Sequence, residues 1–410
     1  MSKKSFTLLI IFLIAIFVAI GWYLYTRTDN GVTDPGTNQT SDLFPFGPGG
    51  GNTSTGTSTS TSTSTQTEID LSTGGEPRTP RLRQISFVPT AGAIASSTAS
   101  STIIRYIERA TGHIYETESE KTAVTKISTI TIPKVHEALF TQNATRLLIR
   151  YFKDDSDIIR TFYAKIATPQ RPEQALEGLF LPDGIRDMAV FANKVFYLVW
   201  KDTDAQGILA DIDGSNKSII FNSSFGEWAT SWTSQNLITL GTKPGNATEG
   251  SSYVLNPATG DYTKALSGIA GLETRLNSDG TLMLYSGRNN SLFGTSVVDI
   301  KTSRSQRLGV ATLADKCVWS SRNRATVYCA VPKSPANGAY PDDWHKGKTS
   351  FDDALWKINA VSGETEELLD TDLSAGISMD MINLSLDQKE NIILFTNKKD
   401  MTVWRYRLND

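Results

Sequence analysis

The sequence predicts an all-β protein: a seven-bladed β-propeller, with six or eight blades as the alternatives. Two observations support this fold class. Units of similar pattern follow one another at roughly 40–50 residues, a period typical of propeller blades. Each unit begins with a bulky apolar residue, followed by a polar turn and a short apolar strand, as at Trp232, Leu276 and Trp319. No convincing run of 3.6-residue periodicity interrupts this pattern, so helices are not expected.

The repeat units can be placed one by one along the chain. We expect blades at 91–132, 136–166, 185–222, 227–266, 271–308, 313–369 and 377–408. The last unit shows three strands where a blade needs four. The segment Leu82–Phe87 precedes the first unit and looks like a strand without a partner. Pairing this strand with the last blade would close the ring and remove an exposed sheet edge.

One turn resembles a known family of repeats. The segment Asp211-Ile-Asp213-Gly-Ser-Asn216-Lys, together with the unit at Leu276, resembles TolB-type and WD-like propeller repeats from about Leu82 to Leu408. The order of anchor, linker and propeller also looks like that of membrane-anchored bacterial propeller proteins. TolB proteins carry an additional N-terminal domain, which this chain replaces, so the resemblance implies the fold and not the TolB role.

The N-terminal residues 1–25 are predicted to be a transmembrane anchor. Phe6 to Tyr25 contains no charged residue and is long enough to cross about 30 Å of hydrocarbon. Lys3 and Lys4 precede it, which favours a cytoplasmic N-terminus and an extracytoplasmic propeller. The alternative is a cleaved signal peptide, although Ala19-Ile-Gly is a poor cleavage site. The protein is therefore expected to contact the membrane through residues 6–25.

Residues 26–81 are predicted to form a disordered linker, and residues 82–410 the propeller. The linker is rich in Ser, Thr, Gly and Pro, with an alternating Ser/Thr run from Thr53 to Thr65. Such a composition buries too little apolar area to offset the chain entropy of folding. We expect it to hold the propeller away from the membrane.

Charge and residue usage exclude several functions. A net charge of −3 and a pI near 5.8 argue against nucleic acid as a partner. The three histidines, His113, His136 and His345, have no metal-ligand spacing. Asp211 and Asp213 fit a tight turn better than a calcium loop. The sequence thus predicts no metal, no cofactor and no catalytic residue.

Cys317 and Cys329 are the only two cysteines, and they are placed symmetrically about a hairpin turn near Asn323. Directly opposed residues on antiparallel strands lie close enough for their side chains to meet. Outside the cytoplasm we expect them to form a disulfide. Two buried free thiols are the alternative.

An insertion at 332–351 is the best candidate for a binding site. It is longer than the other loops within the blades, and long loops on rigid scaffolds often carry function. Tyr340, Trp344 and His345 are predicted to contact a partner, because aromatic residues dominate binding hot spots. The alternative is that Trp344 folds back and plugs the propeller surface.

The absence of a reactive motif favours a non-catalytic function. The main prediction is a membrane-tethered propeller that binds a protein or glycan in the cell envelope. The alternative is an envelope enzyme built on the propeller face, a glycan lyase or hydrolase. Such an enzyme needs clustered acids. The densest set is Asp342, Asp343, Asp352 and Asp353.

Overall fold

The computed structural model describes residues 79–153, 156–166, 176–289, 292–334 and 338–409. The chain divides into two units, 1–70 and 71–410, and every described residue belongs to the second. The anchor predicted at 6–25 and the linker before Thr79 therefore lie outside the described residues. Within the described part, no helix combines the length and apolar character needed to cross a membrane.

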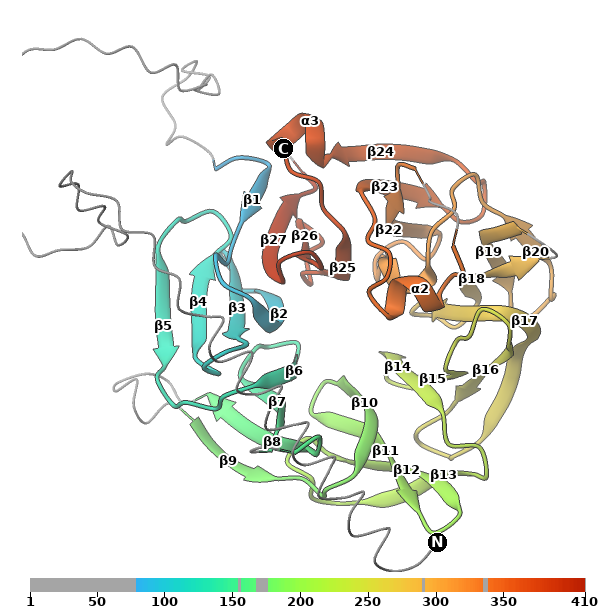
Figure 1. The fold of residues 1–410 in the computed structure, drawn as a ribbon, viewed down its shortest axis with the longest axis horizontal. Coiled ribbons are helices and arrows are strands. Elements are labelled where there is room, and N and C mark those ends of the chain that lie inside the picture. Colours follow the sequence, from blue (N-terminus) through green and yellow to red (C-terminus); the bar gives the residue numbers. More distant parts are fainter. Residues whose placement is uncertain (1–78, 154–155, 167–175, 290–291, 335–337, 410) are drawn as a thin grey trace, which may run out of the picture. The chain divides into compact units, whose positions relative to one another are not determined.

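Antiparallel sheets follow one another around a central axis and form a β-propeller (Figure 1). The first sheet contains β2 (Thr90–Ser97), β3 (Thr102–Glu108), β4 (Ile114–Glu118) and β5 (Val124–Ser128). The second contains β6 (Val135–Phe140), β7 (Arg146–Phe152), β8 (Ile159–Ile166) and β9 (Leu176–Phe180). The third contains β10 (Ile185–Phe191), β11 (Lys194–Lys201), β12 (Asp204–Asp211) and β13 (Ser218–Ser223).

The next sheet is larger, with seven strands: β14 (Trp228–Ser234), β15 (Leu237–Thr242), β16 (Glu249–Leu255), β17 (Tyr262–Leu276), β18 (Leu282–Asn289), β19 (Leu292–Asp299) and β20 (Ser305–Arg307). A four-stranded sheet follows, made of β21 (Cys317–Trp319), β22 (Thr326–Pro332), β23 (Asp353–Asn359) and β24 (Thr365–Asp370). The last strands along the chain are β25 (Met381–Leu386), β26 (Ile392–Asn397) and β27 (Thr402–Arg407). Short helical turns occur at η2 (Ala314–Lys316), α2 (Asp342–His345) and α3 (Thr371–Ala375).

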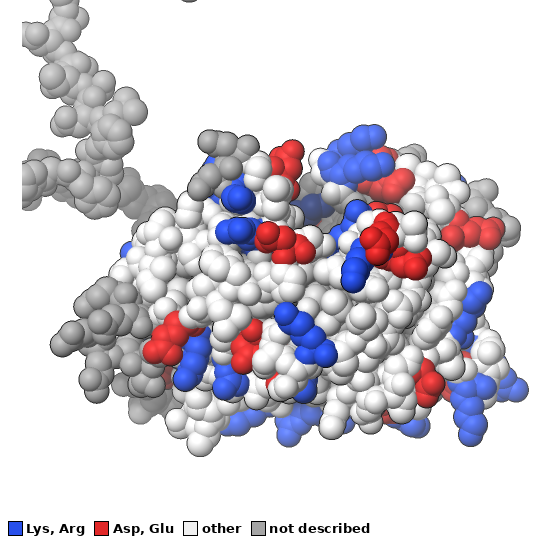
Figure 2. Space-filling model, turned by 90° about the horizontal axis from the view of Figure 1, so that it is seen from below, with Lys and Arg blue, Asp and Glu red and all other residues white. Residues whose placement is uncertain are grey.

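The hydrophobic core lies in layers between neighbouring sheets. In one layer, Ile107 and Ile114 of the first sheet pack with Leu147 and Ile149 of the second, and all four are buried. Alternating apolar residues on the strands supply these layers, as expected for sheets stacked face to face. On the outside, basic and acidic side chains are interspersed over the side of the ring seen in Figure 2.

The ring closes through the N-terminal strand, as the three-stranded final repeat predicts. β1 (Leu82–Gln84) pairs antiparallel with β27 and completes the sheet β1-β27-β26-β25. The guanidinium of Arg405, on β27, is fully buried and donates to the carbonyls of Pro80, Arg81 and Ser119. The ordered ring thus begins before residue 82. The last three residues assigned to the linker, 79–81, accept hydrogen bonds from Arg405 of β27.

β17 departs from the repeat pattern. Its first part, up to Ala270, pairs with β16, and its second part, to Leu276, pairs with β18. One strand thus serves as the outer strand of one four-stranded group and the inner strand of the next. The sequence predicts a break between 266 and 271. The structure places a register shift there, between Ala270 and Glu273, within a continuous strand.

The two cysteines lie opposite each other on neighbouring strands. Cys317 of β21 is the register partner of Cys329 on β22, and the two form a disulfide. Both side chains are buried in the layer that also contains Trp319 and Val327. The cross-link therefore fastens the short inner strand β21 to the centre of its sheet.

Candidate functional site

The insertion between β22 and β23 folds back onto the propeller. Tyr340 and Trp344 are only 6% and 5% exposed, and they pack with Leu313 and Phe351. The indole N–H of Trp344 donates to the carboxylate of Asp380, with N–O distances of 3.0 and 3.1 Å. An exposed recognition surface made of Tyr340 and Trp344 is therefore absent, because both rings fill the interior. The structure has the alternative arrangement, with Trp344 as a plug.

A buried lysine lies beneath this plug. Lys316 is fully buried, and its ammonium forms ion pairs with Asp380 and with Asp353, the latter at 2.7 Å. The same ammonium lies 5.0 Å from the centre of the Trp344 ring and 5.2 Å from that of Phe351. The complete burial of these charges makes the cluster structural, since no substrate reaches it.

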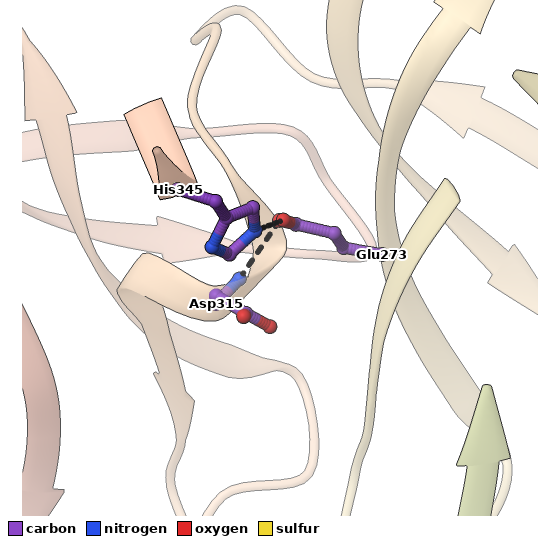
Figure 3. A group of neighbouring side chains, drawn as sticks. All are labelled: Glu273, Asp315 and His345. Atoms are coloured by element: carbon purple, nitrogen blue, oxygen red, sulfur yellow. Dashed lines mark hydrogen bonds and ion pairs between the residues drawn. The ribbon is translucent and has the colours of Figure 1, made fainter. Parts of the chain in front are cut away.

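Three polar side chains meet beside α2 (Figure 3). His345 ends α2, Glu273 lies on β17 and Asp315 lies in η2. The Nε2 atom of His345 is 2.6 Å from Oε1 of Glu273. Oε2 of Glu273 accepts from the Ser286 hydroxyl at 3.3 Å and from the backbone N–H of Asp315 at 3.5 Å. Three groups from three segments thus hold one carboxyl group in place.

Burial differs across the group. The side chain of Glu273 is 2% exposed, whereas that of His345 is 37% exposed. Among the described residues, no hydrogen bond involves Nδ1 of His345, so this nitrogen is free to meet a ligand. A buried carboxylate that orients one nitrogen of a partly exposed imidazole is an arrangement suited to proton transfer.

The environment raises the pKa of both Glu273 and His345. Burial raises the pKa of Glu273, the charge of Asp315 adds to this, and the hydrogen bond from His345 opposes it. For His345, burial opposes protonation, but the hydrogen bond and charge of Glu273 outweigh it. The pKa of His345 therefore lies above its usual value of 6.5. Both shifts favour the protonated form of the group concerned.

A polar cleft adjoins the same carboxyl group. Glu273, Arg275 and Asp315 line it, together with the hydroxyl-bearing Thr239 and Ser252. Nη2 of Arg275 is 3.1 Å from the carboxylate of Asp315, and both side chains are about one-third exposed. His345 is not part of this lining. Its partly exposed ring lies outside this cleft.

The three side chains could also be considered as cation ligands, since one ligand atom of each lies within 4.8 Å of the others. The carboxylate groups, however, already have partners. Oε1 of Glu273 accepts the hydrogen bond from His345, and Oε2 accepts one from a hydroxyl group and one from a backbone N–H. The carboxylate of Asp315 is paired with Arg275. A cation would have to open the His345–Glu273 bond, so this arrangement favours proton sharing.

The acids that the sequence singles out for an enzyme do not converge. Asp342 pairs with Lys346, Asp343 with Lys348 and Asp352 with Lys333, so each of the three is held by a different lysine. Asp353 is buried with Lys316. Of the residues predicted from the insertion, only His345 belongs to the polar site. Its partners Glu273 and Asp315 lie far from it in the sequence, so no local motif indicates them.

Solved structures with the same fold were found, all at low sequence identity. TolB from Acinetobacter baumannii is 12% identical with a TM-score of 0.42, covering 68% of this chain and 63% of TolB. The tricorn protease is 11% identical with a TM-score of 0.50, covering 79% of this chain and 34% of the protease. An oligogalacturonate lyase in complex with manganese is 12% identical with a TM-score of 0.49, covering 81% of this chain and 99% of the lyase. No protein-family model and no curated protein sequence match the chain.

These comparisons support a TolB-like propeller fold. They also correct the main functional prediction. A second oligogalacturonate lyase, from Vibrio parahaemolyticus, covers 78% of this chain at 11% identity and a TM-score of 0.48. The structures found thus include two oligogalacturonate lyases, which match the alternative prediction of a glycan lyase better than the main prediction of a non-catalytic propeller. The similarity concerns the fold alone, so an activity has to be argued from this chain's own residues.

Proposed function

We propose that the protein is a propeller-based enzyme that cleaves a glycan by proton transfer at His345. The observation that carries this proposal is the 2.6 Å bond between the half-exposed imidazole and the buried Glu273 carboxyl group. A buried carboxyl group adjacent to histidine stabilises the imidazolium that forms when the ring accepts a proton. The free Nδ1 atom is the position from which His345 would act.

The site favours elimination over hydrolysis. Glycoside hydrolases need two carboxyl groups that both reach the substrate, about 5–5.5 Å or about 6.5–9.5 Å apart. Glu273 is buried and its oxygens are occupied, which leaves Asp315 as the accessible carboxylate among the described residues of this site. A lyase needs one base near the sugar ring and a cation near the sugar carboxylate. His345 supplies the base, and Arg275 lies in the cleft that adjoins the carboxyl group of Glu273.

The proposed reaction is a β-elimination on a uronate-containing chain. His345 Nδ1 takes the proton from the carbon that bears the sugar carboxylate. As a carbon–carbon double bond forms, the bond to the leaving sugar oxygen breaks, and that oxygen takes up the proton. No water is consumed, and the product carries an unsaturated uronate at its new end.

Replacing His345 with glutamine is expected to lower the rate of elimination about 100- to 10,000-fold, the usual contribution of a positioned general base. The measurement is ultraviolet absorbance of the unsaturated product on a panel of polygalacturonate, alginate and hyaluronan. His136→Gln is the matched control, because His136 lies on β6 and packs against Phe152. Equal activity of the His345→Gln and wild-type proteins would refute the role of His345.

The pH dependence provides a second readout of the same pair. A base acts when deprotonated, so the wild-type rate should rise with pH through the pKa of His345, above 6.5. Glu273→Gln removes the charge that raises this pKa, so the rising part of the pH–rate profile should move to lower pH. If Glu273 had only a structural role, its replacement would lower the rate without moving the rising part of the pH–rate profile.

The finer architecture and the location extend this proposal. We infer seven blades, because β17 contributes to two four-stranded groups within the seven-stranded sheet. The uncharged run at 6–25 would anchor the propeller on the extracytoplasmic side of a membrane. Glycans of the cell envelope would then be within reach.

The cysteine pair provides a test of this location, because disulfides persist in oxidising compartments and are rare in the cytoplasm. In intact cells, Cys317 and Cys329 should resist alkylation until a reductant is added, as measured by mass spectrometry of the trapped protein. A variant lacking residues 1–25 is the control and should carry free thiols. Alkylatable cysteines in the full-length protein would contradict an extracytoplasmic propeller.

A further inference from the structure

Residues of β17, β18, β19 and β20 line a second polar cleft. Its volume is about 470 Å³, within the range of about 300–1,000 Å³ that small-molecule sites occupy. Arg288 and Arg307 supply its charge, and the hydroxyl groups of Tyr285, Ser296 and Ser305 supply further hydrogen-bonding groups. None of these residues takes part in the proton-transfer site.

The two arginines have unused donors. Arg288 donates from Nη1 to the amide oxygen of Asn246 at 2.6 Å, and Arg307 donates from Nη2 to a backbone carbonyl at 3.4 Å. Among the described residues neither forms an ion pair, although Glu249 comes close to the rim at Gly268. A guanidinium carries five N–H donors, so most of them remain for a ligand.

Glycines hollow out this cleft. Gly287 and Gly294 are register partners on β18 and β19, and both lie in its wall. A Cβ atom on Gly294 would lie 2.8 Å from Nη2 of Arg307, so the guanidinium rests directly over the glycine. At Gly287 a Cβ atom would meet Ile269 at 2.5 Å. Side chains at these positions would displace Arg307 and fill the space.

The cleft and the proton-transfer site share one strand. Gly268 and Ile269 at the start of the register shift in β17 line the cleft, and Glu273 follows a few residues later. Between them, Gly271 packs against Pro341, in the same insertion that carries His345. Gly271 to Thr274 are buried, so the strand between the two is covered, and an extended glycan would reach the cleft from His345 around the insertion.

We propose that Arg288 and Arg307 form a subsite for the carboxylate of a uronate residue in the glycan substrate. Planar guanidinium groups bind carboxylates through paired N–H donors, and the hydroxyl-rich wall suits the sugar ring. This inference rests on the proposed glycan activity and adds to it a second position at which an acidic glycan is bound, apart from the residue being cleaved.

The test measures binding separately from cleavage. Calorimetric titration uses His345→Gln protein, to prevent turnover, with oligogalacturonate as the probe. Adding Arg288→Gln and Arg307→Gln should weaken binding at least about tenfold. Gly294→Ala, which displaces the Arg307 guanidinium, should act in the same direction. Arg304→Gln is the matched control, because Arg304 precedes β20 on the same hairpin and lies outside the cleft.

Comparing different ligands shows whether the cleft recognises the sugar carboxylate. Methyl-esterified oligogalacturonate keeps the sugar rings and removes the charge, so it should bind as weakly to the wild-type cleft as the free acid binds to the arginine variants. Equal affinity for ester and acid, or an equal loss with Arg304→Gln, would overturn the subsite. Competition by sulfate alone at equal concentration would show a general anion site and would also overturn it. Tight binding with no turnover by the native protein would refute the proposed function and leave the subsite standing.

Discussion

Replacing Lys316 with methionine is expected to destabilise the propeller by about 3–5 kcal/mol, the usual cost of removing one partner from a buried ion cluster. Lys316 is fully buried between Asp353 and Asp380, and its loss leaves two buried carboxylates without a cation. Chemical unfolding at neutral pH measures the loss. Lys333→Met is the control. Its ammonium also contacts acidic groups, but at the surface, so a much smaller effect is expected.

The same variant should show an altered pH dependence. In the native protein burial raises the pKa of Asp353 to about 6 despite the charge of Lys316, whereas Lys316 and several hydrogen bonds hold the pKa of Asp380 below its usual range despite burial. Without the lysine both pKa values should rise. Protonation then relieves the buried charge, so the variant should lose less stability at about pH 5 than at about pH 8. A loss that is independent of pH would mean that packing, and not charge, explains the effect.

Deleting residues 79–88 from the full chain is expected to cost on the order of 5 kcal/mol or more and to make the protein prone to association. The deletion removes β1 and the buried Ile85, which fills a layer with Ile104 and Val403. It also leaves the buried guanidinium of Arg405 without two of its carbonyl partners. The open edge of β27 is then available for pairing with another molecule.

Thermal unfolding and size-exclusion chromatography test the deletion. An equally long deletion within the Ser/Thr run at 53–65 is the control and should leave the melting temperature unchanged. If the protein lacking 79–88 melts at the wild-type temperature as a monomer, closure through β1 does not stabilise the ring.

The repeats predicted most of the propeller because strands and turns are local patterns. The missing fourth strand of the last unit correctly indicated the pairing of Leu82–Gln84 with β27. β9 was missed at 176–180, beyond the expected end of its unit. The units were expected to end at 266 and begin at 271, whereas the strand in fact continues, because the positive φ values of Gly268 and Gly271 are accommodated by register shifts.

The site could not be predicted in the same way. Glu273, Asp315 and His345 are separated by tens of residues and meet only when two neighbouring sheets and the insertion pack together. Lys316 illustrates the same difficulty, since a lysine in a sequence is normally assigned to the surface. Conversely, the aromatic residues of the insertion suggested an exposed contact, although the space over Leu313 allows them to fold inward.

The continuity of β17 has a consequence for which substrates the protein would select by length. Gly268 and Glu273 lie on the same strand, and a strand advances at most about 3.4 Å per residue. The backbone of β17 between these positions is therefore no more than about 17 Å long. Because Pro341 covers Gly271 between them, a single sugar would occupy either His345 or the arginine cleft, whereas an oligomer long enough to pass around the insertion would occupy both. Cleavage efficiency should accordingly rise in one step once the chain is long enough to span both, and then level off.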